Sequence, residues 1–326
     1  MSKPPSGPLC TRHSIAAQLG EAGLRAGDTV LVHSSLSALG WVCGGANTVV
    51  AALLDVLGEA GTLVVPTQST DNSDPAGWHN PPVPESWWAE IRASLPPYDP
   101  RTTPATGVGV IPEAVRTWPG ALRSAHPQTS FAALGARAAE VVADHALDSQ
   151  LGERSPLARL EAMGARVLLL GVGFGSCTAF HLAEYRLPDP PEADNSFAIT
   201  TPRGRSWATV RDLALDDGDF AELGAAFGGA RPVRLGRVGA AVTRLFSLPD
   251  AVAFAETWLA EHRGDAGHRD DARHRGDAQR RDDAERRSDA QHPGDAGHRN
   301  DAERTDDAER RNDVEDRGGS RLGCCG

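Results

Sequence analysis

Apolar runs that end at small or polar residues divide most of the chain into expected strands and helices. The clearest run is R-V-L-L-L at residues 166–170, which is followed by Gly171, Gly173 and Gly175. A short apolar run closed by glycines is typical of a buried parallel strand that enters a tight loop. We expect a helix after this loop, with Thr178 as its N-cap.

The N-terminal part of the chain predicts a βαβ unit. Apolar residues at helical spacing predict a helix over residues 13–23, and residues 29–32 predict the first strand. A second helix begins after Gly44 and Gly45 and ends at Gly58, and residues 62–65 predict the next strand. Strands joined by a helix in this way lie parallel in one sheet.

Further apolar segments continue the pattern towards residue 259. They predict helices over residues 110–118, 138–145 and 250–259, a helix that begins at Ser155-Pro156, and strands over residues 130–134, 197–200, 206–210 and 231–238. We expect the last three strands to extend the sheet and to border the ligand pocket. The predicted fold class is therefore α/β: a layered α/β sandwich with a central mixed, partly parallel sheet.

The composition changes at residue 263. From there Asp-Ala recurs every six residues between Asp265 and Asp307, and the series ends as Asp313-Val314. A period of six fits neither a helix nor a strand, and charges of both signs fill the repeats, so no apolar face can form. We expect residues 1–12 to be flexible, residues 13–262 to form one domain, and residues 263–326 to be a disordered, low-complexity tail.

The charge balance and the cysteines narrow the class of ligand. The chain has 33 Lys and Arg against 44 Asp and Glu, and the repeat region holds 14 and 17 of these, which leaves 19 against 27 in the body. This acidity disfavours a nucleic-acid surface and favours cationic ligands. Five cysteines without a Cys-x-x-Cys pair indicate neither a disulfide framework nor a zinc site.

No apolar run has the length of a membrane span or the features of an export signal. We therefore expect a cytoplasmic protein that binds no membrane. We also expect that it binds no nucleic acid and no metal, and that it is a monomer or a homodimer.

Residues 66–106 form a long segment that is dense in proline, tryptophan and acids. Loops of this length inside a domain are commonly functional. Asp71, Asp74 and Glu85 supply carboxylates and Trp78 supplies an aromatic face, a combination that suits an amino sugar. The alternative is a rigid cover that its prolines and tryptophans pack together.

His181 and Glu184 are the leading candidates for catalysis. On the expected helix they are three residues apart and emerge on one face, near a strand's carboxyl end, where open α/β sheets bind ligands. A histidine oriented by a carboxylate is a suitable general base, and the alternative is an ordinary solvated ion pair. His126, which precedes Pro127 in a polar loop, is either a catalytic accessory or a structural hydrogen-bonding group.

A hydroxyl-rich loop follows the first strand and contains His33, Ser34, Ser35, Leu36 and Ser37. Hydroxyls and free backbone amides between a strand end and a helix N-terminus suit a phosphate or a pyrophosphate. The alternative is a serine-rich turn that serves only as a cap.

Three other kinds of site are disfavoured. Residues 171–176 lack the third glycine of a dinucleotide fingerprint. The chain has no Gly-x-Ser-x-Gly elbow around Ser176, and Lys3, its only lysine, cannot serve a phosphate loop.

Five sequence blocks occur in a fixed order. They are V-L-V-H-S-S-L-S-A-L-G with Gly44-Gly45 after it, G-T-L-V-V-P-T-Q-S, D-N-S-D-P-A-G-W, R-S-A-H-P-Q-T-S-F-A-A-L-G, and L-L-L-G-V-G-F-G-S-C-T-A-F-H-L-A-E. Through these blocks the chain resembles the aminoglycoside 3-N-acetyltransferase family over residues 13–262. The resemblance implies transfer of an acetyl group from acetyl-CoA to the 3-amino group of a 2-deoxystreptamine aminoglycoside, without a metal, which inactivates the antibiotic.

The resemblance also implies roles for particular residues. The family's catalytic histidine and glutamate correspond to His181 and Glu184, and the histidine of its R-S-x-H-P block corresponds to His126. Its CoA-holding loop corresponds to residues 33–37. The resemblance further indicates that the pantetheine or thioester lies near Gly107, Val108 and Thr178.

Two other functions stay open at this point. One is a non-catalytic protein that binds or sequesters cationic aminoglycosides, and the other is an acetyltransferase of this family that acts on a different amine. Family members often carry Asn where this chain has Cys177, and this thiol would also allow a ping-pong route through a covalent thioester. A lone cysteine beside a buried strand is more often a packing residue.

Overall fold

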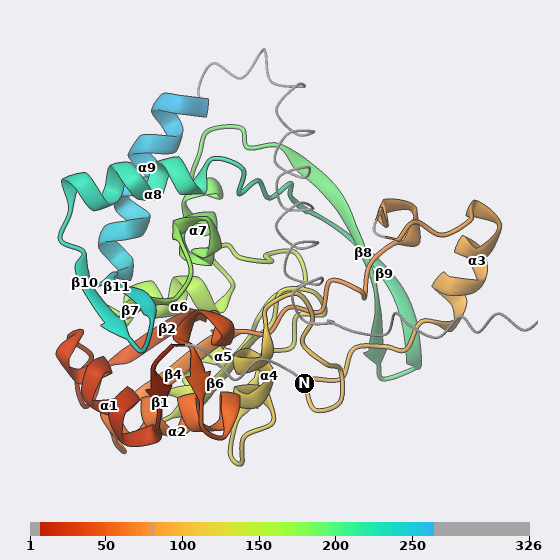
Figure 1. The fold of residues 1–326 in the computed structure, drawn as a ribbon. Coiled ribbons are helices and arrows are strands. Elements are labelled where there is room, and N and C mark those ends of the chain that lie inside the picture. The colour runs from red at the N-terminus through yellow and green to blue at the C-terminus, as the bar shows by residue number, and fades with distance from the viewer. Residues whose placement is uncertain (1–6, 80, 264–326) are drawn as a thin grey trace, which may run out of the picture. The chain divides into compact units, whose positions relative to one another are not determined.

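A computed structural model describes residues 7–79 and 81–263. At its centre is a mixed sheet with the strand order β10 (Arg234–Val238), β11 (Ala241–Ser247), β7 (Arg166–Leu170), β2 (Thr29–Ser34), β4 (Thr62–Pro66), β6 (Phe131–Gly135) and β5 (Leu122–Arg123) (Figure 1). The three middle strands are parallel, and the strands on both sides of them pair antiparallel. The predicted α/β class with a mixed, partly parallel sheet is confirmed.

Helices cover both faces of this sheet. One face packs against α1 (Arg12–Glu21), α2 (Gly45–Leu57) and α4 (Val110–Arg116); the other packs against α5 (Ala138–Val142), α6 (Pro156–Ala162), α7 (His181–Glu184), α8 (Phe220–Ala230) and α9 (Leu248–Arg263). Alternate residues of β7 serve the two cores: Leu168 and Leu170 face the first, and Val167 and Leu169 face the second. Burial on both faces explains why β7 is a continuous apolar run.

The N-terminal βαβ prediction is confirmed, with additional structure between β2 and α2. Thr11 is the N-cap of α1, and Ser14 is its partner in a capping box. Between β2 and α2 lie the 3₁₀ helix η1 (Leu36–Leu39) and the short strand β3 (Trp41–Val42), which pairs with β1 (Leu9–Cys10). The residue before α2, Gly44, has a φ of 83°, which favours glycine.

The C-terminal third differs most from the sequence prediction. The expected strands around residues 197–210 are longer, and they form a separate antiparallel hairpin of β8 (Glu192–Thr201) and β9 (Gly204–Leu213) instead of extending the sheet. The patterns of β11 and α8 were not recognised. In α8, Gly224 allows a close approach, because a Cβ there would lie 2.1 Å from the Cβ of Phe174.

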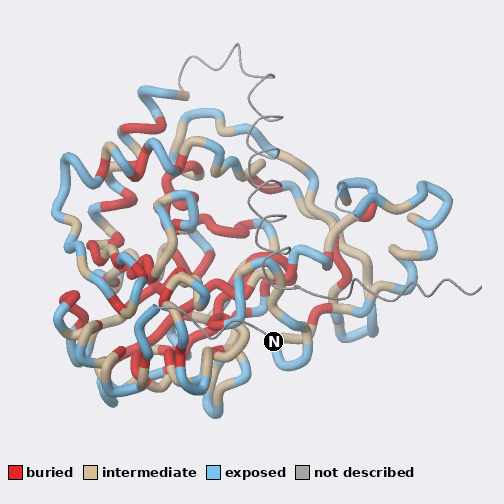
Figure 2. Tube along the Cα trace, in the orientation of Figure 1, coloured by how far each residue is buried: buried red, intermediate tan, exposed pale blue. Residues whose placement is uncertain are grey.

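Residues 66–106 are more ordered than a long loop. They contain the 3₁₀ helix η2 (Pro75–Gly77) and α3 (Glu85–Ser94), and α3 has no fully buried residue. Figure 1 shows α3 beside the β8–β9 hairpin and away from the central sheet, and Figure 2 shows that buried positions concentrate around the sheet. The amide of Asn72 exchanges two hydrogen bonds with the backbone of Ala198, which joins this segment to the hairpin.

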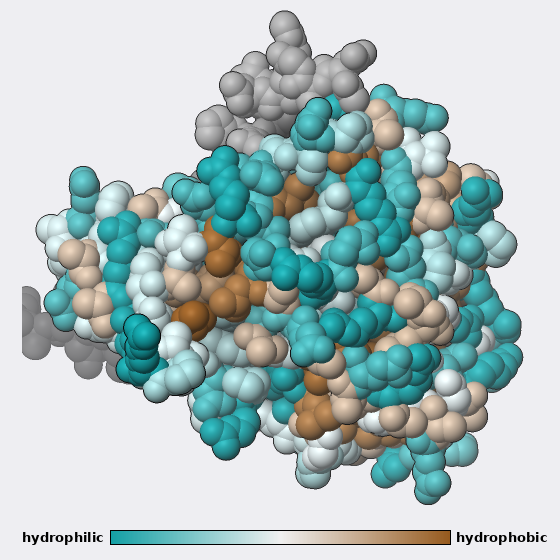
Figure 3. Space-filling view, turned by 180° about the vertical axis from the view of Figure 1, so that it is seen from behind, coloured by the Kyte–Doolittle hydropathy of each residue, from teal (hydrophilic) through white to brown (hydrophobic). Residues whose placement is uncertain are grey.

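Secondary structure begins before residue 13 and continues to residue 263. Strand β1 begins at Leu9 and α9 ends at Arg263, whereas the remainder of the predicted tail lies outside the described residues. None of the helices in residues 7–79 and 81–263 is long and apolar enough to cross a membrane. Seen from behind, the surface is mainly hydrophilic, with its apolar atoms in separate groups (Figure 3).

Candidate active site

The candidate catalytic pair lies after β7, on the single turn of α7. The chain leaves β7 through Gly171 (φ 74°) and two 3₁₀ helices, η3 (Phe174–Ser176) and η4 (Thr178–Phe180). Nδ1 of His181 lies 2.5 Å from Oε2 of Glu184, and the two residues are only 8% and 2% exposed. The predicted contact is therefore present, and its burial distinguishes it from a solvated ion pair.

The start of this turn differs from the prediction. Thr178 was expected to cap a longer helix, but it is the first residue of η4, and neither η4 nor α7 has a side-chain N-cap hydrogen bond. Its hydroxyl lies 3.4 Å from Nε2 of His33 instead. Thr178 thus connects the end of β2 with the loop that leads to His181.

The hydrogen bond with Glu184 determines which nitrogen of His181 can react. A carboxylate only accepts hydrogen bonds, so the N–H of the neutral imidazole is on Nδ1 and donates a hydrogen bond to Oε2. The lone pair is then on Nε2. Within the described part of the chain no hydrogen bond uses Nε2. The ring of Phe220 packs 4.7 Å from the imidazole, centroid to centroid. The pair is thus held in one orientation with one basic nitrogen unused.

His33 is a second buried imidazole beside this pair. Burial, and secondly the charge of His181, lower the pKa of His33 to about 3, so it is neutral at physiological pH. The amide of Ser35 donates to the carbonyl of Leu170 at 3.0 Å, so the ends of β2 and β7 lie side by side. This adjacency brings the predicted CoA loop next to the turn that carries the candidate catalytic pair.

The predicted cofactor residues cluster around the end of β2. The hydroxyls of Ser35 and Ser37 are 3.1 Å apart, and the hydroxyl of Ser34 is buried without a hydrogen-bond partner in the structure. Gly109 follows Gly107 and Val108, and a Cβ on Gly109 would lie 3.7 Å from the carbonyl oxygen of Ser34. The two loops therefore face each other across a short distance, with an orphaned hydroxyl that a polar ligand could satisfy.

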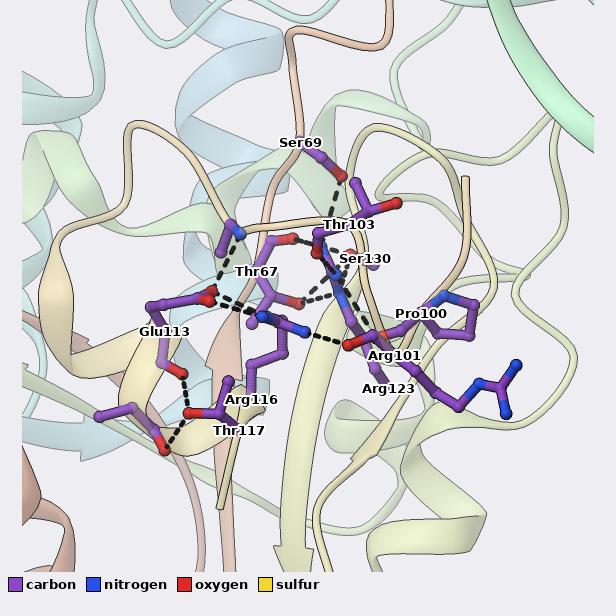
Figure 4. Close-up of polar contacts among 12 residues, drawn as sticks. Thr67, Ser69, Pro100, Arg101, Thr103, Glu113, Arg116, Thr117, Arg123 and Ser130 are labelled. Atoms are coloured by element: carbon purple, nitrogen blue, oxygen red, sulfur yellow. Dashed lines mark hydrogen bonds and ion pairs between the residues drawn. The ribbon is translucent and has the colours of Figure 1, made fainter. Parts of the chain in front are cut away.

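Arg123, which the sequence analysis passed over, holds the loop before α4 in position (Figure 4). Its guanidinium donates to the carbonyl of Thr67 at 2.6 Å, to the hydroxyl of Ser130 at 3.0 Å and to the carbonyl of Thr103. Burial lowers its pKa, and the ring of Tyr98 lies 5.0 Å from the guanidinium carbon. This buried hub joins the ends of β4, β5 and β6 to the segment that leads to Gly107.

His126 occupies a different environment from His181. It is 0% exposed, and its Nδ1 accepts hydrogen bonds from the amides of Gln128 and Thr129, both at 3.1 Å. Its Nε2 donates to the carbonyl of Leu147 at 3.2 Å, and burial lowers its pKa to about 4. Both nitrogens are thus used within the protein, which supports the structural alternative; a catalytic role of His126 stays a prediction.

The four predicted substrate residues lie in the segment around η2 and α3. Asp71 and Glu85 are exposed, whereas the carboxylate of Asp74 pairs with Arg92 at 2.7 Å and the indole of Trp78 donates to Ser73. Burial opposes ionisation of Asp74, but hydrogen bonds from Arg92 and Ala76 outweigh it and lower the pKa. Over the described ranges, no hydrogen bond or ion pair joins these four residues to His181 or Glu184.

Cys177 is fully buried, and burial raises the pKa of its thiol to about 12. A thiol in this environment is protonated and inaccessible, which is unfavourable for a nucleophile. No group of three or more His, Cys, Asp or Glu that could hold a metal ion occurs among the residues that the structure describes.

The contact between Arg263 and Glu184 could not be predicted from the sequence. Nη1 of Arg263 donates to Oε1 of Glu184 at 2.5 Å. In the sequence Arg263 is the first residue of the low-complexity tail, and no local pattern connects it with a glutamate 79 positions earlier.

Comparison with known proteins assigns the family. A family model described as aminoglycoside 3-N-acetyltransferase matches residues 31–260. The chain belongs to this family. The resemblance found in the sequence blocks is thereby confirmed.

The relatives span most of the chain. The SPbeta prophage-derived aminoglycoside N(3')-acetyltransferase-like protein YokD of Bacillus subtilis is 47% identical over 249 residues, which are 76% of this chain and 92% of that protein. Aminoglycoside N(3)-acetyltransferase VII of Streptomyces paromomycinus is 41% identical over 281 residues, covering 79% and 94%.

Solved structures agree with this assignment. A binary complex of AAC-IIIb with CoASH has a TM-score of 0.70 at 35% identity and covers 78% of this chain and 98% of its own. AAC-VIa bound to sisomicin has a TM-score of 0.71 at 32% identity and covers 78% and 99%.

Proposed function

We propose that the protein transfers the acetyl group of acetyl-CoA directly to the 3-amino group of a 2-deoxystreptamine aminoglycoside, with His181 as general base and Glu184 as its orienting partner. The observation that carries this proposal is the buried Nδ1–Oε2 contact of 2.5 Å, which leaves Nε2 without a hydrogen-bond partner among the residues that the structure describes. The relatives named for this activity, one bound to CoASH and one to sisomicin, supply the substrate classes.

The chemistry requires a base because an aliphatic amine is largely protonated at neutral pH. Nε2 of His181 takes a proton from the attacking amine, and Glu184 stabilises the imidazolium that results. Because Glu184 is 2% exposed, its charge acts on the imidazole with little screening by water. The pair therefore combines a fixed orientation with a strong local field.

The acyl donor is proposed to bind across residues 33–37, Gly107 and Val108, with its thioester near Thr178. The attack of the amine forms the C–N bond and breaks the C–S bond, and the thiolate that leaves can take the proton that His181 has accepted. The hydroxyl of Thr178 and backbone amides of residues 33–37 are candidates to donate hydrogen bonds to the developing oxyanion. His33 stays neutral, so it adds no charge that would compete with the proton on His181.

The burial and the high pKa of Cys177 favour direct transfer over a covalent enzyme intermediate. The role of the segment around η2 and α3 in binding the aminoglycoside is a further proposal. It rests mainly on Asp71 and Glu85, because the charge of Asp74 is already balanced by Arg92.

A panel of aminoglycosides, assayed for thiol release from acetyl-CoA, tests the proposal. We expect thiol release that depends on the acceptor and a product that is heavier than the acceptor by one acetyl group, about 42 Da. When the product is mapped by NMR, the acetyl group should lie on the 3-amino nitrogen. Binding without a product would identify a sequestering protein. Acetylation of only a different amine would identify another acceptor for the same chemistry.

A further inference from the structure

The last residue of α9 extends the catalytic pair into a longer network. Nη1 of Arg263 donates to Oε1 of Glu184 at 2.5 Å, and Nε donates to Oδ2 of Asp219 at 2.8 Å. Nη2 contacts the second oxygen of Asp219 and donates to the carbonyl of Asp216 at 2.8 Å. The side chains of Arg263, Glu184 and Asp219 are 17%, 3% and 19% exposed, so these contacts are largely shielded from water.

Each oxygen of Glu184 has its own partner. Oε2 faces Nδ1 of His181, whereas Oε1 accepts from Arg263 and, at 3.2 Å, from the amide of Asp216. Because the two oxygens are engaged on opposite sides, the carboxylate cannot rotate without breaking a charge-assisted hydrogen bond. Arg263 therefore fixes the oxygen that orients His181.

Arg263 also changes the electrostatics of the pair. A buried carboxylate is costly unless a positive charge accompanies it, and a guanidinium is always protonated. The same positive charge attracts the carboxylate of Glu184 and repels a positive charge on the imidazole of His181. Asp219 neutralises only part of this effect, since it contacts the far side of the guanidinium.

Besides Asp219 and Asp216, the titratable side chains of His33 and Tyr185 interact with the pair. His33 from β2 is held neutral, because burial and the charge of His181 lower its pKa to about 3. Tyr185 follows α7, and its pKa is raised first by burial and, among the smaller causes, by Glu184. Among the side chains of residues 7–79 and 81–263, Arg263 is the permanent cation that forms an ion pair with the dyad.

We propose that Arg263 is a positioning residue of the catalytic pair, which fixes Glu184 towards His181 and places a permanent positive charge beside the pair. The proposal rests on the proposed function for its catalytic meaning. Phe220 supports it physically: its ring lies 4.7 Å from the ring of His181 and 6.0 Å from the guanidinium carbon of Arg263, so α9 and the start of α8 enclose the pair.

The chain offers a matched control in Arg186. Its guanidinium, like that of Arg263, joins carboxylates from different elements: those of Glu153 at 2.6 Å, Glu161 at 2.5 Å and Glu256 in α9. It makes no contact with the side chain of His181 or Glu184 in the structure. Replacing Arg186 therefore disturbs an ion-pair network that includes Glu256 of α9, the helix that ends at Arg263, and leaves the contacts of the catalytic pair in place.

The test compares Arg263→Gln, Arg263→Lys and Arg186→Gln in the full-length protein. For Arg263→Gln we expect a kcat at pH 7 lower by about tenfold and an acid limb of the kcat profile moved upward by about one pH unit. The KM for acetyl-CoA should change by less than about threefold. Arg263→Lys should recover part of both effects, and Arg186→Gln should leave the acid limb in place even if it lowers the Tm.

An NMR titration of the His181 ring separates this proposal from the proposed function. Its signal is assigned by its loss in His181→Asn, and the titration needs no turnover. An upward shift in Arg263→Gln supports the role of Arg263 even if no acceptor is acetylated, in which case the proposed function fails alone. An unchanged titration and acid limb in both Arg263 variants, with only a lower Tm, would overturn the proposal and leave Arg263 a structural residue.

Discussion

Two groups of buried histidines use their nitrogens in different ways. In the proposed catalytic group, Nδ1 of His181 donates to Glu184, and Nε2 has no hydrogen-bond partner among the described residues. In the second group, His126 and His145 pack with ring centroids 4.8 Å apart, and each uses both nitrogens within the protein. His145 contacts the hydroxyl of Ser124 and the carbonyl of Gln150, both at 2.9 Å.

The difference shows why burial alone does not identify a catalytic histidine. A base needs an orienting partner on one nitrogen and a free lone pair on the other. Where both nitrogens are satisfied by the backbone and hydroxyls, an imidazole fastens loops together, as His126 does for residues 126–129 and 147. The same side-chain type is therefore available as a base in one group and bound on both nitrogens in the other, within the residues that the structure describes.

The largest expected effect comes from His181→Asn. Asparagine keeps a donor near the position of Nδ1 but removes Nε2, so kcat should fall by about 10²- to 10⁴-fold. Acetyl-CoA affinity and the free energy of unfolding should change little, since the contact with Glu184 can be kept. Steady-state kinetics, acetyl-CoA titration and urea unfolding measure the three quantities. A fully active variant would remove His181 from the mechanism.

His126→Ala should act on stability instead. It leaves the amides of Gln128 and Thr129 without their acceptor, and unsatisfied buried donors together with a cavity should cost about 2 to 4 kcal/mol. His126→Asn can replace Nδ1 with an oxygen and should recover part of this loss. Both variants should retain kcat when assayed well below their Tm. A loss of kcat in His126→Asn as large as in His181→Asn would show that His126 is catalytic after all.

Sequence reasoning succeeded where the determining contacts are local. His181 and Glu184 are three residues apart, and β7 is apolar because both of its faces are covered, so both could be predicted. Arg263 could not, because its contact with Glu184 depends on how α9 packs against α7. The hairpin of β8 and β9 was assigned to the main sheet for a similar reason: alternation predicts a strand but not its neighbour.

The same comparison predicts how stability depends on pH. Burial is the main cause that lowers the pKa values of His126 and His145 to about 4 and about 3. Below about pH 6.5 the unfolded chain therefore binds protons on these two residues that the folded chain does not bind. Stability should therefore be complete above about pH 6.5 and should fall as the pH decreases towards 4, with a slope of up to about 1.4 kcal/mol per pH unit for each histidine.

Urea unfolding at a series of pH values checks this expectation. His145→Gln should show a shallower loss than the parent between pH 6.5 and 4.5, since one titrating group is gone. His13→Gln, at an exposed position of α1, serves as the control and should follow the parent. Equal slopes in the parent and His145→Gln would show that His145 does not govern acid stability.

The smallest expected effect is that of Cys177→Ala, which separates the two mechanisms open to the catalytic group. Cys177 precedes Thr178 and lies close to His181 in sequence, but its thiol is fully buried and its pKa is raised to about 12 by burial. Removing the sulfur should cost about 1 kcal/mol through a small cavity and change kcat by less than about threefold. Mass spectrometry of the parent after incubation with acetyl-CoA alone should show no acetylated protein. A stable acetyl adduct at Cys177, together with an inactive Cys177→Ala, would transfer the chemistry from the imidazole to the thiol, because only a covalent route requires that sulfur.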